Sequence, residues 1–374
     1  SEQASSVAMT FNAGKDDEYL SGNIKINDAI YLERAAGTLA KIRIDKAYNH
    51  NNPKIKITSP AKATEYNTSV GSYSNNVNIS RPDYILEDIF EGKDSDESNY
   101  CFILGGETGH DIIIAERNFY VQREGESGGR FYQSMGSAIS AATNKGSEYK
   151  YVVFIIKNNV STSAPSSLST NKVTIKSAEY ELVENEYKFT DTTYTVKLEL
   201  SSQQWLTVVS GELVLKNVNI IGSAAPVLTV QSGSVTMENV TIGTSDDNNI
   251  SVATLTGGSL TVKNVTAQNI STSNNLFDVK NASLTLSDST INNVKAKNIV
   301  SATVGAAVNI SNTTISGSDG DTETIFNLNS TDGNETTVTL TDVAISSNTV
   351  TDTTIKAVGS NTKLNISGSS ITGN

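Results

Sequence analysis

Acid–base chemistry on the repeats of this chain would need ionisable side chains close together, and the outward position of the first strand of each repeat forms one row where they could stand. Hydrolysis of a glycosidic bond needs two carboxyl groups placed on either side of it, and elimination from a uronate needs a base beside metal-binding carboxylates. The row holds one aspartate and one lysine, several repeats apart, and no Arg or His occurs after residue 130. We therefore expect no catalytic residues in the repeats. The row reads Thr207, Thr229, Thr254, Asp278, Ser301, Asn327 and Lys356.

A few segments have residue types that could bind a cation or a phosphate, and one thiol could react, but none of them has a specific motif. The acidic turns Asp94–Glu97 and Asp319–Asp321 offer oxygen atoms, but their spacing matches no calcium loop, so we interpret them as solvated turns. The glycine-rich segment Gly105–Gly109 is followed by no helical pattern and is interpreted as a turn. The single cysteine, Cys101, lies in an apolar run, which favours a structural thiol. We expect no metal site and no cofactor.

Composition separates two parts of the chain. The net charge is −12 and the pI is about 4.8, which disfavours binding to nucleic acids or anionic lipids. All 14 Tyr precede residue 201, and the following residues are rich in Thr, Ser, Asn, Val, Ile and Leu. The Gly-rich stretch 125–129 is the best candidate boundary. We predict one domain over residues 1–128 and a second over residues 129–374.

The second part repeats. Segments such as Ser259–Ala267 recur, and the first apolar anchor of each returns after 22, 25, 24, 24, 30 and 26 residues. A period of this size is typical of a solenoid, a stack of similar coils. The anchors are Leu213, Val235, Leu260, Leu284, Val308, Val338 and Leu364.

The pattern inside one repeat indicates the type of solenoid. Leu260 and Val262 alternate with polar residues, as in a strand, and a second short strand follows Asn264. A third strand, such as Ala253–Leu255, precedes this pair. We predict a right-handed parallel β-helix with three strands per coil, of the pectate-lyase-like type. Its sharp corner needs residues that tolerate a left-handed backbone. That structural column is Asn217, Asn239, Asn264, Asp288, Asn312 and Asp342, with Gly368 at the next position.

The first coils are expected to be irregular. Residues 133–142 have helical character and precede the strand 151–156, as expected for a helix that caps the open core. If the protein has a catalytic site, we expect it in residues 131–205, which contain Tyr residues and longer loops. We expect the end near Asn374 to be covered by a missing cap or by another chain.

Residues 1–124 contain short strand-like runs between polar loops, which favour an antiparallel β-sandwich. The segment Ile30–Ile44 resembles the start of Bacteroidales fimbrillins. That resemblance implies a transthyretin-like sandwich in an outer-membrane lipoprotein, anchored by a lipid upstream of Ser1. It also implies a processing site at Arg34, where cleavage would open a groove for a strand donated by a partner.

The leading hypothesis from the sequence is a non-catalytic, adhesin-like or fimbria-associated protein of the cell surface, not an enzyme. Its β-helix would serve as a stalk or display surface, and its partners would be surface glycans, surface proteins or other fimbrial subunits. The alternatives are a polysaccharide-active or glycan-binding β-helix and a trimeric phage tailspike.

Thr236, Thr261 and Thr285 align across repeats, as the threonines of an ice-binding face would. The neighbouring column contains Lys216 and Glu238, whose charges argue against a regular lattice.

Overall fold

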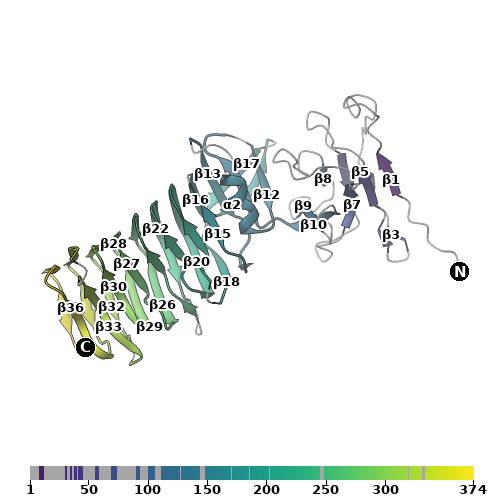
Figure 1. The fold of residues 1–374 in the computed structure, drawn as a ribbon. Coiled ribbons are helices and arrows are strands. Elements are labelled where there is room, and N and C mark those ends of the chain that lie inside the picture. The colour runs from purple at the N-terminus through teal and green to yellow at the C-terminus, as the bar shows by residue number, and fades with distance from the viewer. Residues whose placement is uncertain are drawn as a thin grey trace. The chain divides into compact units, whose positions relative to one another are not determined.

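The computed structural model describes residues 116–374 except 127, 144–147, 170, 185, 202, 245–247, 319 and 331–332. It also describes the backbones of the strands between residues 8 and 116 (Figure 1). The chain divides into two compact units, residues 1–118 with 130–133 and residues 119–129 with 134–374.

The strands of the first unit form mixed sheets, so the prediction that they pair only in antiparallel fashion is wrong. In the larger sheet, β1, β5 and β7 are parallel, and β7, β10 and β9 are antiparallel. Parallel neighbours need long crossovers, and residues 12–40 separate β1 from β5. Short alternating runs look alike in both kinds of sheet, which is why the sequence did not distinguish them. The bounds are β1 Ala8–Phe11, β5 Lys41–Ile44, β7 Ser69–Tyr73, β9 Tyr100–Gly105 and β10 Asp111–Glu116.

Smaller pairings complete the first unit. Strands β2, β6 and β8 are parallel, and β3 pairs with β4 in an antiparallel hairpin. The bounds are β2 Ile30–Tyr31, β3 Arg34–Ala35, β4 Thr38–Leu39, β6 Ile55–Thr58 and β8 Phe90–Gly92.

The second unit is a parallel β-solenoid of about nine turns over residues 150–372, which confirms this part of the prediction. Figure 1 shows its strands stacked in sequence order from β13 to β36. A regular coil contributes three strands, for example β24, β25 and β26, and each pairs with the equivalent strand of the next coil. These three rows define the first, second and third faces of the solenoid.

The first face is an eight-stranded parallel sheet. Its strands are β15 Ser166–Leu168, β19 Leu206–Val208, β21 Leu228–Val230, β24 Ala253–Leu255, β27 Phe277–Lys280, β30 Asn298–Thr303, β33 Thr322–Asn329 and β36 Val350–Val358.

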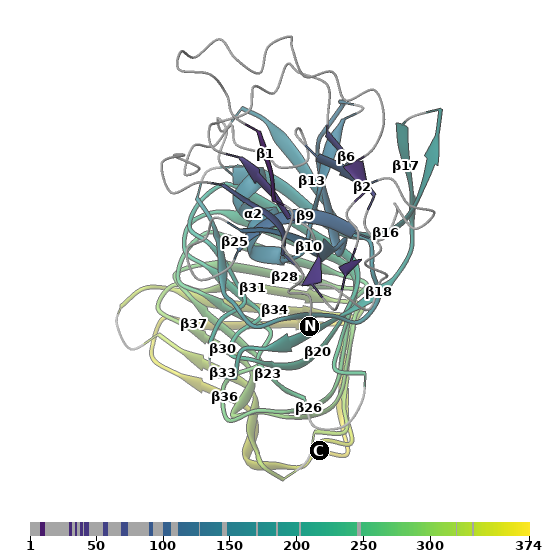
Figure 2. The same ribbon diagram turned by 90° about the vertical axis from the view of Figure 1, so that its right-hand side faces the viewer.

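The sheet that forms the second face starts with β11 Phe119–Arg123 and β12 Gly129–Tyr132, which precede β13 in the strand order. Strand β11 also pairs with β13, in antiparallel fashion. Strands β25, β28, β31, β34 and β37 follow one another along one side of the stack in Figure 2. The bounds are β13 Lys150–Ile155, β16 Lys172–Val183, β20 Glu212–Ala224, β22 Ser234–Ile242, β25 Ser259–Lys263, β28 Ser283–Ser287, β31 Ala307–Ser311, β34 Thr336–Thr341 and β37 Thr362–Ser367.

The third face contains the later halves of β20 and β22, which run through the corner. Its other strands are β14 Val160–Thr162, β18 Tyr194–Glu199, β23 Asn249–Ile250, β26 Thr266–Ser271, β29 Thr290–Lys295, β32 Thr314–Ser316, β35 Ala344–Ser346 and β38 Ser370–Thr372.

The predicted apolar anchors are stacked in register at the second face. Leu213 pairs with Val235, Val235 with Leu260, and the series continues to Leu364. Alternate side chains point inward, so Leu260 and Val262 are at most 1% exposed. Phe277 and Phe326 fill the same core from the first face. The stack therefore has one continuous apolar interior.

Helix α2, Met135–Thr143, packs against β11, β13 and β15 at the start of the solenoid. The hydroxyl of Ser134 accepts a hydrogen bond from the backbone N–H of Ser137 and so caps the first turn. Met135, Ala138, Ile139 and Ala142 are buried. This helix agrees with the helical segment predicted at residues 133–142.

Candidate functional site

A column of polar residues occupies the corner between the second and third faces of the solenoid and is here called the asparagine ladder. All six predicted members have a left-handed backbone, with φ between 46° and 55°. Asparagine, aspartate and glycine adopt this conformation at lower cost than other residues. The ladder is Asn217, Asn239, Asn264, Asp288, Asn312 and Asp342, and Gly368 continues it at φ 60°.

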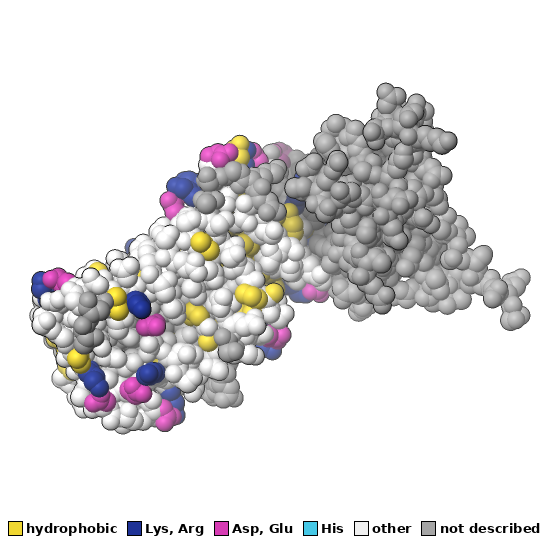
Figure 3. All heavy atoms as spheres, viewed as in Figure 1, with side chains coloured by type: hydrophobic (Ala, Val, Ile, Leu, Met, Phe, Trp, Pro, Cys, Tyr) yellow, Lys and Arg dark blue, Asp and Glu magenta, His cyan; other side chains and the backbone are white. Residues whose placement is uncertain are grey.

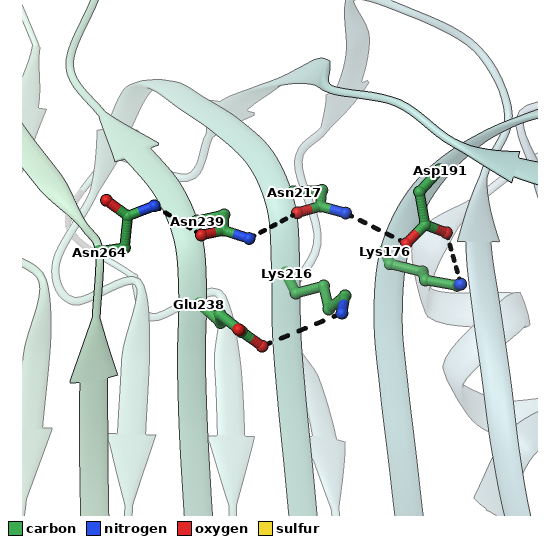
Figure 4. Close-up of polar contacts among 7 residues, drawn as sticks. All are labelled: Lys176, Asp191, Lys216, Asn217, Glu238, Asn239 and Asn264. Carbon is green, nitrogen blue, oxygen red and sulfur yellow. Dashed lines mark hydrogen bonds and ion pairs between the residues drawn. The ribbon is translucent and has the colours of Figure 1, made fainter.

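The amides of the ladder are joined in one direction (Figure 4). Asn264 Nδ2 donates to Asn239 Oδ1 at 2.6 Å, and Asn239 Nδ2 donates to Asn217 Oδ1 at 3.2 Å. Asn217 Nδ2 then donates to Asp191 Oδ2 at 3.4 Å. Lys176 Nζ lies 2.6 Å from the other Asp191 oxygen. The chain of amide donors thus ends on a carboxylate that a lysine neutralises.

Two aspartates interrupt the ladder. Asn312 Nδ2 donates to Asp288 Oδ1 at 3.2 Å. An ionised carboxylate has no proton to donate, so Asp288 cannot donate to Asn264 as an asparagine would. Asp342 has the same limitation toward Asn312. The ladder therefore consists of one segment from Asp191 to Asn264 and a second from Asp288 to Asn312.

A second corner carries a shorter ladder that the sequence analysis missed. Asn269 and Asn293 have φ values of 53° and 51°, and Asn293 Nδ2 donates to Asn269 Oδ1 at 2.8 Å. Their separation of 24 residues equals a repeat interval, which was the available signal. Gly317 and Ser347 continue this column with left-handed backbones.

Buried asparagines satisfy backbone groups inside the coils. Asn248 Oδ1 accepts from the N–H of Gly222 at 2.9 Å. Asn348 Oδ1 accepts from the N–H of Ser318 at 3.0 Å. Buried polar atoms need such partners because their lost hydration is otherwise uncompensated. These side chains are structural.

The structure aligns the predicted row of outward residues on the first face but does not bring its ionisable members together. Thr254 pairs with Asp278, Asp278 with Ser301, Ser301 with Asn327, and Asn327 with Lys356. Asp278 and Lys356 are thus three strand spacings apart, about 14 Å. Asp352 lies 2.6 Å from Lys356, and this hydrogen bond raises the pKa of the Lys356 ammonium.

Charged side chains on the second face gather in its first coils. Lys176, Lys216, Glu238 and Lys263 occupy one column, and Lys216 Nζ lies 3.9 Å from a Glu238 carboxylate oxygen. Farther along the face, Lys363 lies 2.5 Å from Glu335, and its hydrogen bond lowers the pKa of that carboxyl group. Exposed pairs of this kind contribute little to stability.

Aromatic side chains cluster at the hairpin of β16 and β17 Glu186–Asp191. This hairpin lies in the region that the sequence predicted to be irregular, and it extends away from the coils in Figure 2. The Phe189 ring stacks on Phe154 with centroids 3.9 Å apart, and Tyr120 lies 4.8 Å from Phe189. Tyr180 and Tyr187 are half-buried at the edge of the cluster, with ring centroids 5.8 Å apart.

Most of the remaining predicted site residues fall where side chains are not described, and Asp321 is the exception. Arg34 lies in β3 opposite Leu39, and Cys101 lies in β9 opposite Ala115. The segments 94–97 and 106–109 and residue 319 lie outside the described residues. Asp321 Oδ2 lies 3.8 Å from Lys295.

Within the described residues, no group of three or more His, Cys, Asp or Glu side chains is placed to hold a metal ion. No helix in that part of the chain is long and apolar enough to cross a membrane. Comparisons with protein families, with curated proteins and with solved structures found no match for this chain.

A ladder residue such as Asn239 has two roles: its backbone adopts the left-handed conformation, and its side-chain amide makes hydrogen bonds to the neighbouring coils. Two substitutions of Asn239 separate these roles. Asn239→Gly removes the amide but tolerates the left-handed backbone, so we expect a loss of about 1 kcal/mol in unfolding free energy. Asn239→Ala should lose about 1–2 kcal/mol more, because Ala adopts this conformation poorly. Chemical unfolding followed by circular dichroism measures both. Equal losses for the two variants would contradict the backbone role.

Replacing Asp288 by Asn should join the two ladder segments. The new amide can donate to Asn264 Oδ1 and still accept from Asn312, so we expect a gain of about 0.5–1 kcal/mol. Asp278→Asn is the matched control, because it removes the same charge from an outward position away from the ladder. The same unfolding measurement compares them, and an equal change in both variants would mean that charge, not the ladder, is responsible.

Proposed function

We propose that this protein is a non-catalytic protein of the cell surface whose β-solenoid acts as a stiff stalk or display surface. The supporting observation is the continuity of the stack, in which the anchor residues pair in register from Leu213 to Leu364. A solenoid held by backbone ladders over one apolar core resists bending and presents long outer faces. At about 4.8 Å per coil, nine coils extend about 43 Å.

The finer features of the fold belong to the same proposal. The coils wind in the right-handed sense, because strand–crossover–parallel-strand connections have that hand in nearly all proteins. The first unit is a fimbrillin-like sandwich exported to the outer membrane, with Arg34 as its processing site. The resemblance of Ile30–Ile44 to fimbrillins supports this assignment.

A second candidate is a glycan-binding or polysaccharide-active protein. It draws support from the half-buried rings of Tyr180 and Tyr187, since aromatic side chains supply much of the apolar lining of ligand sites. Lys176, which is paired with Asp191, lies at another ring of the same aromatic cluster, with its Nζ 5.3 Å from the Phe154 ring centroid.

Two measurements decide between the candidates. The full chain is incubated with polygalacturonate, alginate and neutral polysaccharides, and released sugar and unsaturated uronate are measured. We expect no turnover. Labelling of intact producing cells with a membrane-impermeant biotin reagent should modify the protein. Turnover of any polymer, or failure to label on intact cells, would refute the leading proposal.

A further inference from the structure

The last coil of the solenoid, residues 350–374, exposes apolar side chains that its neighbours bury. It comprises β36, β37 and β38, which pair with β33, β34 and β35 of the preceding coil. Leu340 and Ile345 of that preceding coil are 0% exposed, whereas Ile366 and Ile371 in the same columns are 46% and 39% exposed. In Figure 3, hydrophobic side chains reach the surface at this end of the solenoid. Another layer of strands packed on the last coil would cover them.

The last coil is built like the coils before it. Asn374 Nδ2 donates to the carbonyl oxygen of Ile345 at 3.1 Å, as Asn348 Nδ2 donates to that of Ile315 one coil earlier. Gly368 has the left-handed backbone of the asparagine ladder. The outer edges of the three strands therefore form an ordered template for pairing with further strands.

Few devices protect these edges from pairing. Exposed strand edges are commonly protected by Pro, by bulges or by free Lys side chains. Residues 350–374 contain no Pro, and the irregularity in the pairing of β36 lies before Ile355. Both lysines of the coil are engaged within the chain, Lys356 with Asp352 at 2.6 Å and Lys363 with Glu335 at 2.5 Å.

Charge and size favour a contact between two copies of this coil. The chain has a net charge of −12, but residues 350–374 carry one Asp and two Lys, a net charge of +1. Two such coils can therefore approach each other without the repulsion that the rest of the chain would produce. The coil has 25 residues, which matches the roughly 20–30 residues per partner of a stable protein interface.

The opposite end of the solenoid does not offer a matching surface. Helix α2 packs there against β11, β13 and β15, and a helix presents no strand edge. Stacking head to tail would have to displace this helix. Within the described residues, the surface that fits the last coil is thus the last coil of a second copy, and such a contact closes after two chains.

Symmetry fixes how the strands would pair. A two-fold axis perpendicular to the solenoid axis reverses the direction of winding seen from one side, so the strands of the two copies run antiparallel on every face. With Asn365 on the axis, Leu364 lies opposite Ile366 of the second copy, and Lys363 lies opposite Ser367. Side chains opposite each other in an antiparallel pair point to the same side. The inward apolar residues therefore meet each other, and no like charges are opposed.

We propose that two copies of this chain associate end to end through their last coils, about a two-fold axis through the middle of β37. The two stacks then form one stack twice as long. The starts of the two solenoids lie at its opposite ends, so copies displayed on two cells would join them. This last step rests on the proposed function, whereas the contact itself does not.

The first test is the mass of the full chain in solution. Light scattering after size-exclusion chromatography at about 10 μM should give twice 39.8 kDa. Ile366→Lys places a charge in the contact, and it should be monomeric, with association at least about tenfold weaker. Val209→Lys is the matched control, because Val209 is also 40% exposed but directly follows β19, far from the last coil. It should remain dimeric.

The second test is a disulfide on the symmetry axis. In a Cys101→Ser background, Asn365→Cys would face itself across the two copies, with Cα atoms about 4.5–5.5 Å apart, within reach of a disulfide. Asn309→Cys stands in the same outward column two coils earlier and cannot reach its equivalent. After mild oxidation, a non-reducing gel should show a covalent dimer for Asn365→Cys and not for Asn309→Cys.

Four results would overturn the proposal. They are a monomeric wild type, growth beyond the dimer, an Ile366→Lys variant that remains dimeric, or equal crosslinking at residues 365 and 309. Thermal unfolding checks that each variant is folded, and Ile371→Lys replaces Ile366→Lys if the latter does not fold. A monomer that is labelled on intact cells refutes the contact and leaves the proposed function standing. A dimer that is not labelled has the opposite meaning.

Discussion

The structure depends on one constraint, the register in which each coil pairs with the next. In a parallel sheet, side chains alternate between two sides, so a slip of one residue would move every inward side chain outward. Leu284, Val308 and Val338 would then meet solvent, and Thr285, Asn309 and Thr339 would enter the core. Burial of the anchor residues therefore determines which side chains point outward as well as which point into the core.

The corners make the register specific. Each coil must turn sharply between its second and third faces, and asparagine meets that need with its left-handed backbone and with an amide that bonds to the coil before it. The ladder ends at Asp191, the last residue of β17, whose carboxylate is neutralised by Lys176.

Much of the second unit could be predicted because its signals repeat. Leu260 and its equivalents recur at nearly constant intervals, and Asn264 recurs at a fixed distance from them. The column of Asn269 and Asn293 was harder to see, because Gly or Ser takes the same conformation in other coils. The hairpin of β16 and β17 occurs once, so no repeat reveals it. The aspartates of the ladder look equivalent to asparagine in backbone preference, and only hydrogen-bond polarity shows that they interrupt it.

In the first unit, short alternating runs such as β5 and β10 do not show whether a strand pairs with a parallel or an antiparallel partner.

The most direct test of this account is a crosslinking measurement of the register. In a Cys101→Ser background, Thr236→Cys with Thr261→Cys places two thiols on residues that pair directly, with Cα atoms about 4.8 Å apart. Thr236→Cys with Lys263→Cys puts them on the same face two residues out of register, about 8 Å apart, beyond the reach of an unstrained disulfide. Non-reducing peptide mapping after mild oxidation should find the disulfide in the first pair and not in the second. A disulfide that forms preferentially in the second pair would contradict the register on which the core and the ladder depend.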